Sequence, residues 1–225
     1  MRRISIPIAA CFIVLALAAL SAAPIKAAGQ APAGPSATLT YRRVFKGSSP
    51  EFIAIQVRED SDEATFEVRQ LDDDPGASPF AVSAALRGKM FALAAELKHF
   101  AGLDLDVKRK LANLGAKTFR WERGAEAHET TFNYTLDSSA NQLMQIFEGL
   151  ALQQEHAVTL ARRTKYDRLG LNEALLEFET DLTRNRLPEP QRFLPLLEQI
   201  AKDSRIMSIA RQRARALAER IRPLG

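Results

Sequence analysis

Cysteine is nearly absent from this chain of 225 residues: the single one, Cys11, lies in an apolar run close to the N-terminus. Beyond that run, no internal disulfide, thiolate metal site or cysteine nucleophile can form. The stability of the remaining chain must therefore come from a hydrophobic core. About 195 residues are enough for one domain, or for a domain with an appendage.

Motifs that identify common enzyme classes are also absent. The chain has no Gly-x-Ser-x-Gly, no Ser-x-x-Lys and no phosphate-binding Gly-rich loop. His128-Glu129 begins like a zinc-protease motif, but Phe132 stands where the second histidine belongs. Glu96 and His99 have the spacing of a di-iron ligand pair, yet no second copy of this pair occurs. From these motifs we therefore expect no catalytic residue, metal or cofactor. A catalytic triad that is assembled in space from distant residues would leave no such sequence motif.

Two further polar candidates have simpler interpretations. Asp72–Asp74 could attract calcium, but Pro75 and Gly76 follow where a calcium loop would need more oxygen ligands. We interpret the three carboxylates as favouring the positive N-terminus of a helix that starts near Ser78. His156 is interpreted as a helix-surface residue.

The positive charge of the chain comes mainly from its first residues. The whole sequence has 31 basic and 27 acidic residues, a net charge of +4 and an isoelectric point near 9.4. Arg2, Arg3 and Lys26 lie in the first 28 residues, which contain no aspartate or glutamate. The rest of the chain has 28 basic against 27 acidic residues, so its charge gives no argument for nucleic-acid binding.

Residues 1–28 have the three parts of a secretion signal. Two arginines precede the apolar run 4–23, and small residues follow it. We therefore predict a signal peptide over 1–28 and an exported mature chain, periplasmic or secreted, without a transmembrane segment. Two alternatives use the same residues. One is lipidation of Cys11 at a loose lipobox, and the other is an uncleaved anchor, since the run is about long enough to span a bilayer.

The composition changes after the signal. Residues 29–37 are mostly alanine, proline, glycine and serine, and we expect a flexible leader there. Residues 38–138 are expected to form an antiparallel sheet with a packed helix, because β-branched and aromatic segments alternate with turns. The expected strands are 38–45, 52–57, 64–70, 118–123 and 130–136.

The helix that packs on the sheet is predicted from a cap and an apolar stripe. Ser78 would cap this helix, and Pro79 suits its first turn. The stripe consists of Leu86, Met90, Leu93, Leu97 and Phe100. A second, short helix is predicted over 106–114, with Val107, Leu111 and Leu114 facing inward.

Residues 139–225 are predicted to be entirely helical and to dock on the sheet region. A capping box at Ser139 would start the first helix. The next helix has a stripe formed by Leu171, Leu175, Phe178 and Leu182. Residues 189–202 and 205–222 are expected to form a final pair, kinked or shortened at Pro195. This pair resembles a HEAT-type helical hairpin over 194–221, but one unit is too few for a solenoid and implies no activity.

Three groups of side chains are candidates for binding. The first is a polar face of the sheet, which either consists of cross-strand charge pairs or serves as a binding surface. It would contain Glu67, Arg69, Arg120, Glu122, Asn133 and Thr135. An aromatic group, either core or the lining of an apolar pocket, consists of Phe119, Trp121, Phe132 and Tyr134. The third is a group of arginines on the last helix, which either cover a core edge or contact an anionic envelope surface. They are Arg211, Arg213, Arg215, Arg220 and Arg222.

Together these observations predict an α+β protein with a five-stranded antiparallel sheet, a packed helix and an all-helical C-terminal part. The expected function is that of an exported, non-catalytic interaction or structural module. Its partner would be a protein or an envelope surface, with no role for nucleic acid. A binder of a small apolar ligand between sheet and helices is the alternative, and a hydrolase of unknown substrate is a third possibility.

The signal peptide predicts a specific mass for the exported chain. The chain recovered from the exported fraction should have a denatured mass that corresponds to loss of about the first 28 residues. A lipid on Cys11 would add mass to a chain cut just before that residue. A full-length mass would show that the N-terminal segment is retained and would contradict cleavage.

Overall fold

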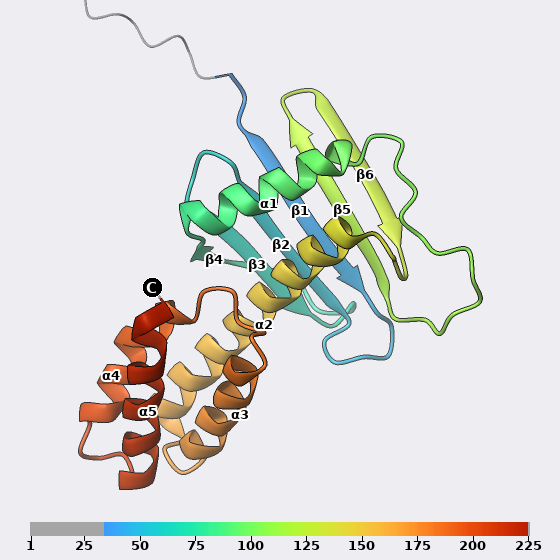
Figure 1. Cartoon of the computed structure of the whole chain (residues 1–225). Helices are drawn as coiled ribbons and strands as arrows, with labels where there is room; N and C mark the ends of the chain where they lie inside the picture. The colour runs from blue at the N-terminus through green and yellow to red at the C-terminus, as the bar shows by residue number, and fades with distance from the viewer. Residues whose placement is uncertain (1–33, 225) are drawn as a thin grey trace, which may run out of the picture. The chain divides into compact units, whose positions relative to one another are not determined.

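The computed structural model of the chain describes residues 34–224, so the predicted signal peptide and most of the predicted leader lie outside the described residues. It has one antiparallel sheet and five α-helices (Figure 1). The strands are β1 (Ala37–Val44), β2 (Phe52–Arg58), β3 (Glu63–Arg69), β4 (Ala77–Ala81), β5 (Ala116–Arg123) and β6 (Glu126–Phe132). The helices are α1 (Ala84–Glu96), α2 (Ser138–Tyr166), α3 (Leu171–Thr183), α4 (Leu194–Lys202) and α5 (Ser208–Ile221), with 3₁₀ turns at Lys98–Phe100, Pro190–Phe193 and Arg222–Leu224.

This arrangement confirms the predicted α+β class, but the sheet has six strands rather than five. Their order is β4-β3-β2-β1-β5-β6, and all neighbours are antiparallel. Tyr41 on β1 lies opposite Ile55 on β2 and Phe119 on β5. All three side chains are fully buried, because α1 and the first half of α2 cover this face of the sheet (Figure 1).

The additional strand, β4, occupies the place where the helix was predicted to begin. Ser78 and Pro79 do not start a helix, since both lie in β4, where Pro79 is opposite Thr65 of β3. A proline is tolerated in an edge strand because its missing N–H is not needed by a further neighbour. Helix α1 begins later, after Ser83, whose hydroxyl accepts a hydrogen bond of 3.2 Å from the amide of Leu86.

The apolar stripe of α1 faces the core as predicted. Four of its five residues are buried, and Leu86 is half-buried. The helix ends before the stripe does, because Lys98, His99 and Phe100 have left-handed φ angles of 52°, 51° and 67°. This turn places the ring of Phe100 at 5.4 Å from that of Phe119.

The predicted short helix over 106–114 is wrong, because these residues form a loop. The carboxylate of Asp106 accepts a hydrogen bond from the backbone amide of Asn133 (2.8 Å). The side-chain oxygen of Asn133 in turn accepts a hydrogen bond from the backbone amide of Leu114 (2.7 Å). Leu111 and Leu114 are exposed rather than inward. The side-chain hydrogen bonds with Asn133 thus replace the backbone bonds that a helix would have formed.

The last strand is also shorter at its C-terminal end than predicted. β6 ends at Phe132, which is buried, whereas Tyr134 and Leu136 are exposed. The alternating pattern continued past the last residue that pairs with β5, so it predicted burial for two residues that lie outside the sheet.

Helix α2 has 29 residues and takes part in two hydrophobic clusters. Its N-cap is Asp137, which accepts the amide of Ala140 (2.8 Å), so the predicted capping box at Ser139 is wrong. The first half of α2 packs on the sheet, up to Ala151. The second half contributes Leu160 to a separate cluster formed with α3, α4 and α5. One helix is therefore shared by both cores.

The helical region packs around the second half of α2 (Figure 1). The predicted stripe of α3 is confirmed, since all four of its residues are buried. Pro195 lies in the first turn of α4, where its missing N–H costs nothing, so the helix predicted over 189–202 is shortened to begin at Leu194 rather than kinked. Over residues 34–224, no helix is both long enough and apolar enough to cross a membrane.

The segment after α3 ties the helical region to the sheet region through Glu189, which is 2% exposed. Its carboxylate accepts hydrogen bonds from the amide of Ser83 (3.0 Å) and from Nε of Arg192 (2.8 Å). Its own amide donates to the side chain of Gln153 on α2 (3.0 Å). A buried carboxylate satisfied in this way fixes the position of α2 against the start of α1.

The same segment crosses α2 at Gly149, and this close approach predicts a cost for any side chain there. A Cβ at Gly149 would lie 2.7 Å from the carbonyl oxygen of Arg186. Gly149→Ala should therefore destabilise the fold by about 1–3 kcal/mol. Gly88→Ala in α1 is the matched control, because nothing lies within 4 Å of its added Cβ, and it should stabilise by about 0.5–1 kcal/mol. Urea unfolding measures the free energy of unfolding of both variants. Equal changes in the two variants would contradict the close approach of the chain at Gly149.

Candidate functional site

A cleft of about 640 Å³ lies where the sheet region and the helical region meet. Its walls come from β1, β2, α1 and α2, and from the segment 184–188 that follows α3. We call it the polar cleft, because its lining includes Arg43, Lys89, Glu148, Glu155, Arg184 and Arg186. Ile53, Leu86 and Ile146 also line it and give it an apolar part.

Glu148 of α2 is held in place on one wall of the polar cleft. The hydroxyl of Tyr41 donates a hydrogen bond to its carboxylate, and Nη1 of Arg43 lies 2.7 Å from the other carboxylate oxygen. Burial raises the pKa of Tyr41 far above its ordinary value, and the charge of Glu148 raises it further. Tyr41 therefore remains a protonated donor at any physiological pH, and Glu148 remains fixed.

Glu155 lies two turns further along α2 and has a different environment. Within residues 34–223, its carboxylate forms no hydrogen bond or ion pair. Burial raises the pKa of Glu155 above the ordinary value of a glutamate, and the charge of Glu148 adds to this, although Arg43 and His156 act in the opposite direction. Glu155 is thus a half-buried carboxyl that is free to accept a proton or a hydrogen bond.

The opposite wall is basic, and its Arg186 is held by the buried carboxylate of Asp181. Arg186 donates to Asp181 (2.9 Å), and the other oxygen of Asp181 lies 2.9 Å from Nε2 of His156. Both His156 and Asp181 are buried, so the prediction that His156 is a surface residue is wrong. Arg184 is exposed and forms no ion pair with any described side chain.

A second cleft, of about 400 Å³, lies between α1 and the end of the sheet that contains Trp121. The ring of His99 stacks on Trp121 at 4.4 Å, and the guanidinium of Arg123 lies 5.3 Å from it. Trp121 is only 2% exposed, so a ligand cannot stack on its face. Phe119, Trp121 and Phe132 belong to the core, whereas Tyr134 is exposed and does not.

The other candidates from the sequence do not come together. His128 lies on strand β6 and contacts Glu126 (3.0 Å), while Glu129 pairs with Arg120 (3.2 Å), so no zinc-protease geometry forms. His99 stacks on Trp121 instead of standing beside Glu96. Among the described residues, no group of three or more histidines or carboxylates is arranged to hold a metal.

The acidic run Asp72–Asp74 lies in the loop before β4 and not at a helix N-terminus. Because α1 starts after Ser83, the predicted interaction of these carboxylates with a helix dipole is wrong. Asp73 instead accepts the amide of Gln70 (2.9 Å), which stabilises the turn after β3.

The uncovered face of the sheet carries ion pairs within and between strands. Arg120 contacts Glu122 (2.8 Å) and Glu129 (3.2 Å), and Arg69 contacts Glu67 (2.7 Å). Asn133 and Thr135, the other two predicted members, lie beyond the end of β6. Arg213 on α5 pairs with Glu179, and Arg222, directly after α5, pairs with Glu198 (2.9 Å), so these two arginines are used within the helical region.

The residues of the polar cleft were not singled out by the sequence. The only local signal is that Glu148 and Glu155 are seven residues apart, which places them on one face of a helix. Arg43, the partner of Glu148, is 105 residues away in the sequence, a distance that no local pattern bridges. No family model and no curated protein matches this chain.

The raised pKa of Glu155 predicts a pH-dependent effect on stability. The folded state binds this proton more readily than the unfolded chain, so the carboxyl loses stabilising free energy as the pH rises from 4.5 through its raised pKa. Glu155→Gln cannot ionise, and it should be more stable than the wild type at about pH 7 and lose this advantage near pH 4. Urea unfolding at both pH values measures this, with the exposed Glu177→Gln as control. If the difference in free energy of unfolding between Glu155→Gln and the wild type were the same at both pH values, it would contradict the raised pKa of Glu155.

Proposed function

We propose that the protein is an exported, non-catalytic binding module that holds a small polar ligand in the polar cleft. The observation that supports this most directly is Glu155, a half-buried carboxyl without a partner in the described chain, which faces the same cleft as the unpaired Arg184. A carboxyl that loses water without gaining a hydrogen bond is unfavourable. A ligand that donates a hydrogen bond to Glu155 and offers an anionic or acceptor group to Arg184 would satisfy both.

The size and position of the polar cleft support this proposal. Ligand sites commonly have volumes of about 300–1,000 Å³ and combine apolar walls with a few fixed polar groups. The polar cleft has about 640 Å³, and Glu148 is fixed in it by Tyr41 and Arg43. It lies between sheet and helices, where an apolar ligand was the alternative expectation. Its charged lining favours a polar ligand instead.

The two carboxylates also bear on the hydrolase hypothesis. Glu148 and Glu155 are seven residues apart on one helix, so their Cα atoms are separated by about 10 Å along its axis. Since Glu148 is already bound by two protein groups, the arrangement favours ligand binding over acid–base catalysis.

Native mass spectrometry of the chain recovered from the exported fraction tests the proposal. A bound ligand should appear as extra mass that is lost on denaturation. Gln145→Trp should remove this mass, because Gln145 lines the polar cleft and is exposed to it, and an indole would fill the space.

The matched control for this experiment is Gln199→Trp, an exposed position of α4 outside the cleft, which should keep the extra mass. A wild-type chain without extra mass would remove a tightly held ligand from consideration. Extra mass that persists in Gln145→Trp would place the ligand elsewhere on the protein.

A further inference from the structure

A second surface lies at the far end of the helical region, where α2 passes into α3 and α4 passes into α5 (Figure 1). We call it the helical tip and define it as residues 162–169 and 202–209 together with Arg211. It exposes four large apolar side chains. Their exposed fractions are 72% for Tyr166, 80% for Leu169, 40% for Met207 and 52% for Ile209.

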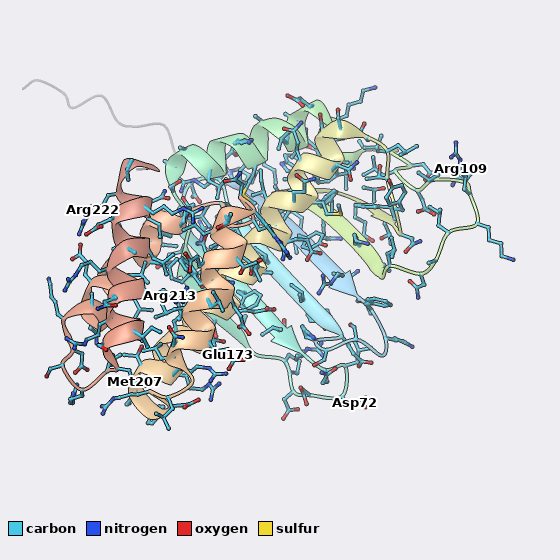
Figure 2. The ribbon with its side chains drawn as sticks, turned by 60° about the horizontal axis from the view of Figure 1, so that its bottom comes forward. Asp72, Arg109, Glu173, Met207, Arg213 and Arg222 are labelled. Atoms are coloured by element: carbon cyan, nitrogen blue, oxygen red, sulfur yellow. The ribbon has the colours of Figure 1, made fainter. Side chains whose placement is uncertain are left out.

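The two segments of the helical tip are neighbours in space. The pKa of Asp203 is lowered mainly by its hydrogen bonds with Arg205, and also by the charge of Arg168 from the other segment. Arg213, one turn after Ile209 on the same face of α5, donates to Asn172 at the start of α3 (3.2 Å). Ile209 therefore faces the chain next to Leu169. In Figure 2, Met207 lies at this end of the region.

The helical tip is strongly basic. Its two acidic residues, Asp167 and Asp203, are paired with Arg163 (2.9 Å) and Arg205 (2.8 Å). The remaining basic residues have no carboxylate partner within residues 34–223, apart from a contact of 4.0 Å between Lys202 and Glu198. These residues are Arg162, Lys165, Arg168, Lys202 and Arg211.

We propose that the helical tip binds an anionic lipid surface. Exposed apolar side chains such as the four of the helical tip are buried at the boundary between headgroups and acyl chains when a protein surface binds a membrane. Unpaired lysines and arginines around them bind lipid phosphates, and their long stems keep the charge at headgroup level. This complementarity of charge and apolarity identifies the occupant. The proposal goes beyond ligand binding in the polar cleft and does not depend on it.

Co-sedimentation with vesicles tests this proposal on the mature chain. The wild type should bind vesicles of phosphatidylcholine mixed with phosphatidylglycerol and bind phosphatidylcholine alone at least about tenfold more weakly. Binding to the mixed vesicles should weaken as the salt concentration rises, because screening reduces the attraction between exposed charges.

Variants separate the two contributions of the helical tip. Leu169→Ser with Ile209→Ser should reduce binding to the mixed vesicles at least about tenfold, because it removes apolar insertion. Arg162→Glu with Lys165→Glu should abolish the preference for phosphatidylglycerol. Glu173→Lys, at an exposed position in the first turn of α3, should strengthen binding. All of these side chains are at least partly exposed, so unchanged thermal unfolding confirms that the variants fold.

The matched control is Leu111→Ser. Leu111 is 45% exposed and follows three consecutive basic residues in the loop after α1, yet it lies outside the helical tip, so its variant should bind as the wild type does. Loss of binding in Leu111→Ser but not in the Leu169 variant would overturn the proposal. Equal binding of the wild type to both kinds of vesicle would overturn it too. The proposal would likewise be overturned if the chain self-associated in the absence of vesicles and Leu169→Ser abolished this self-association. The helical tip would then be a contact between two copies of the chain.

Discussion

The continuity of helix α2 is the constraint on which the rest of the structure depends. Its first half completes the core that covers the sheet, and its second half completes the core of the helical region. Neither cluster could form in its present place if α2 were broken between Ala151 and Leu160. The packing of both regions therefore supplies much of the stability of a helix about 43 Å long, as is usual for helices in proteins.

The middle of α2 is where neither hydrophobic cluster fully covers the helix, and this explains why polar chemistry collects there. Glu148, Gln153, Glu155 and His156 all lie on this stretch. Three of them have partners from distant parts of the chain: Arg43 with Glu148, the amide of Glu189 with Gln153, and Asp181 with His156. Buried polar groups with a full set of partners favour one relative arrangement of the packed elements. Among the described residues, Glu155 is the member of this set that has no such partner.

The sequence predicted those parts of the fold that depend on local periodicity. The stripes of α1 and α3 and the inward position of Phe119 and Trp121 follow from spacing alone. The start of α1 was mistaken because Ser78-Pro79 has the residues of a helix cap, although the pairing of β4 with β3 decides its conformation. The helix predicted over 106–114 failed for a similar reason, since Asn133 binds that segment from beyond β6.

The candidate site was less predictable than the fold. His156 was assigned to the surface as an isolated histidine, because its partner Asp181 lies 25 residues away on another helix and gives no local signal. The environment of Glu155 arises from burial by segments that meet only in the folded chain. Spacing could place Glu148 and Glu155 on one helical face but could not show that a cleft lies beside them.

The length of α2 has a consequence for how the polar cleft and the helical tip relate to each other. Glu155 and Tyr166 are eleven residues apart on this helix, which separates them by about 16 Å. Electrostatic interactions through physiological saline are screened over about 8 Å. The charges at the outer end of the tip, beside Tyr166, therefore lie about two screening lengths from the carboxyl in the cleft, whereas Arg162 lies only about 10 Å from it along the helix. The shared helix is also a direct mechanical link between the two sites.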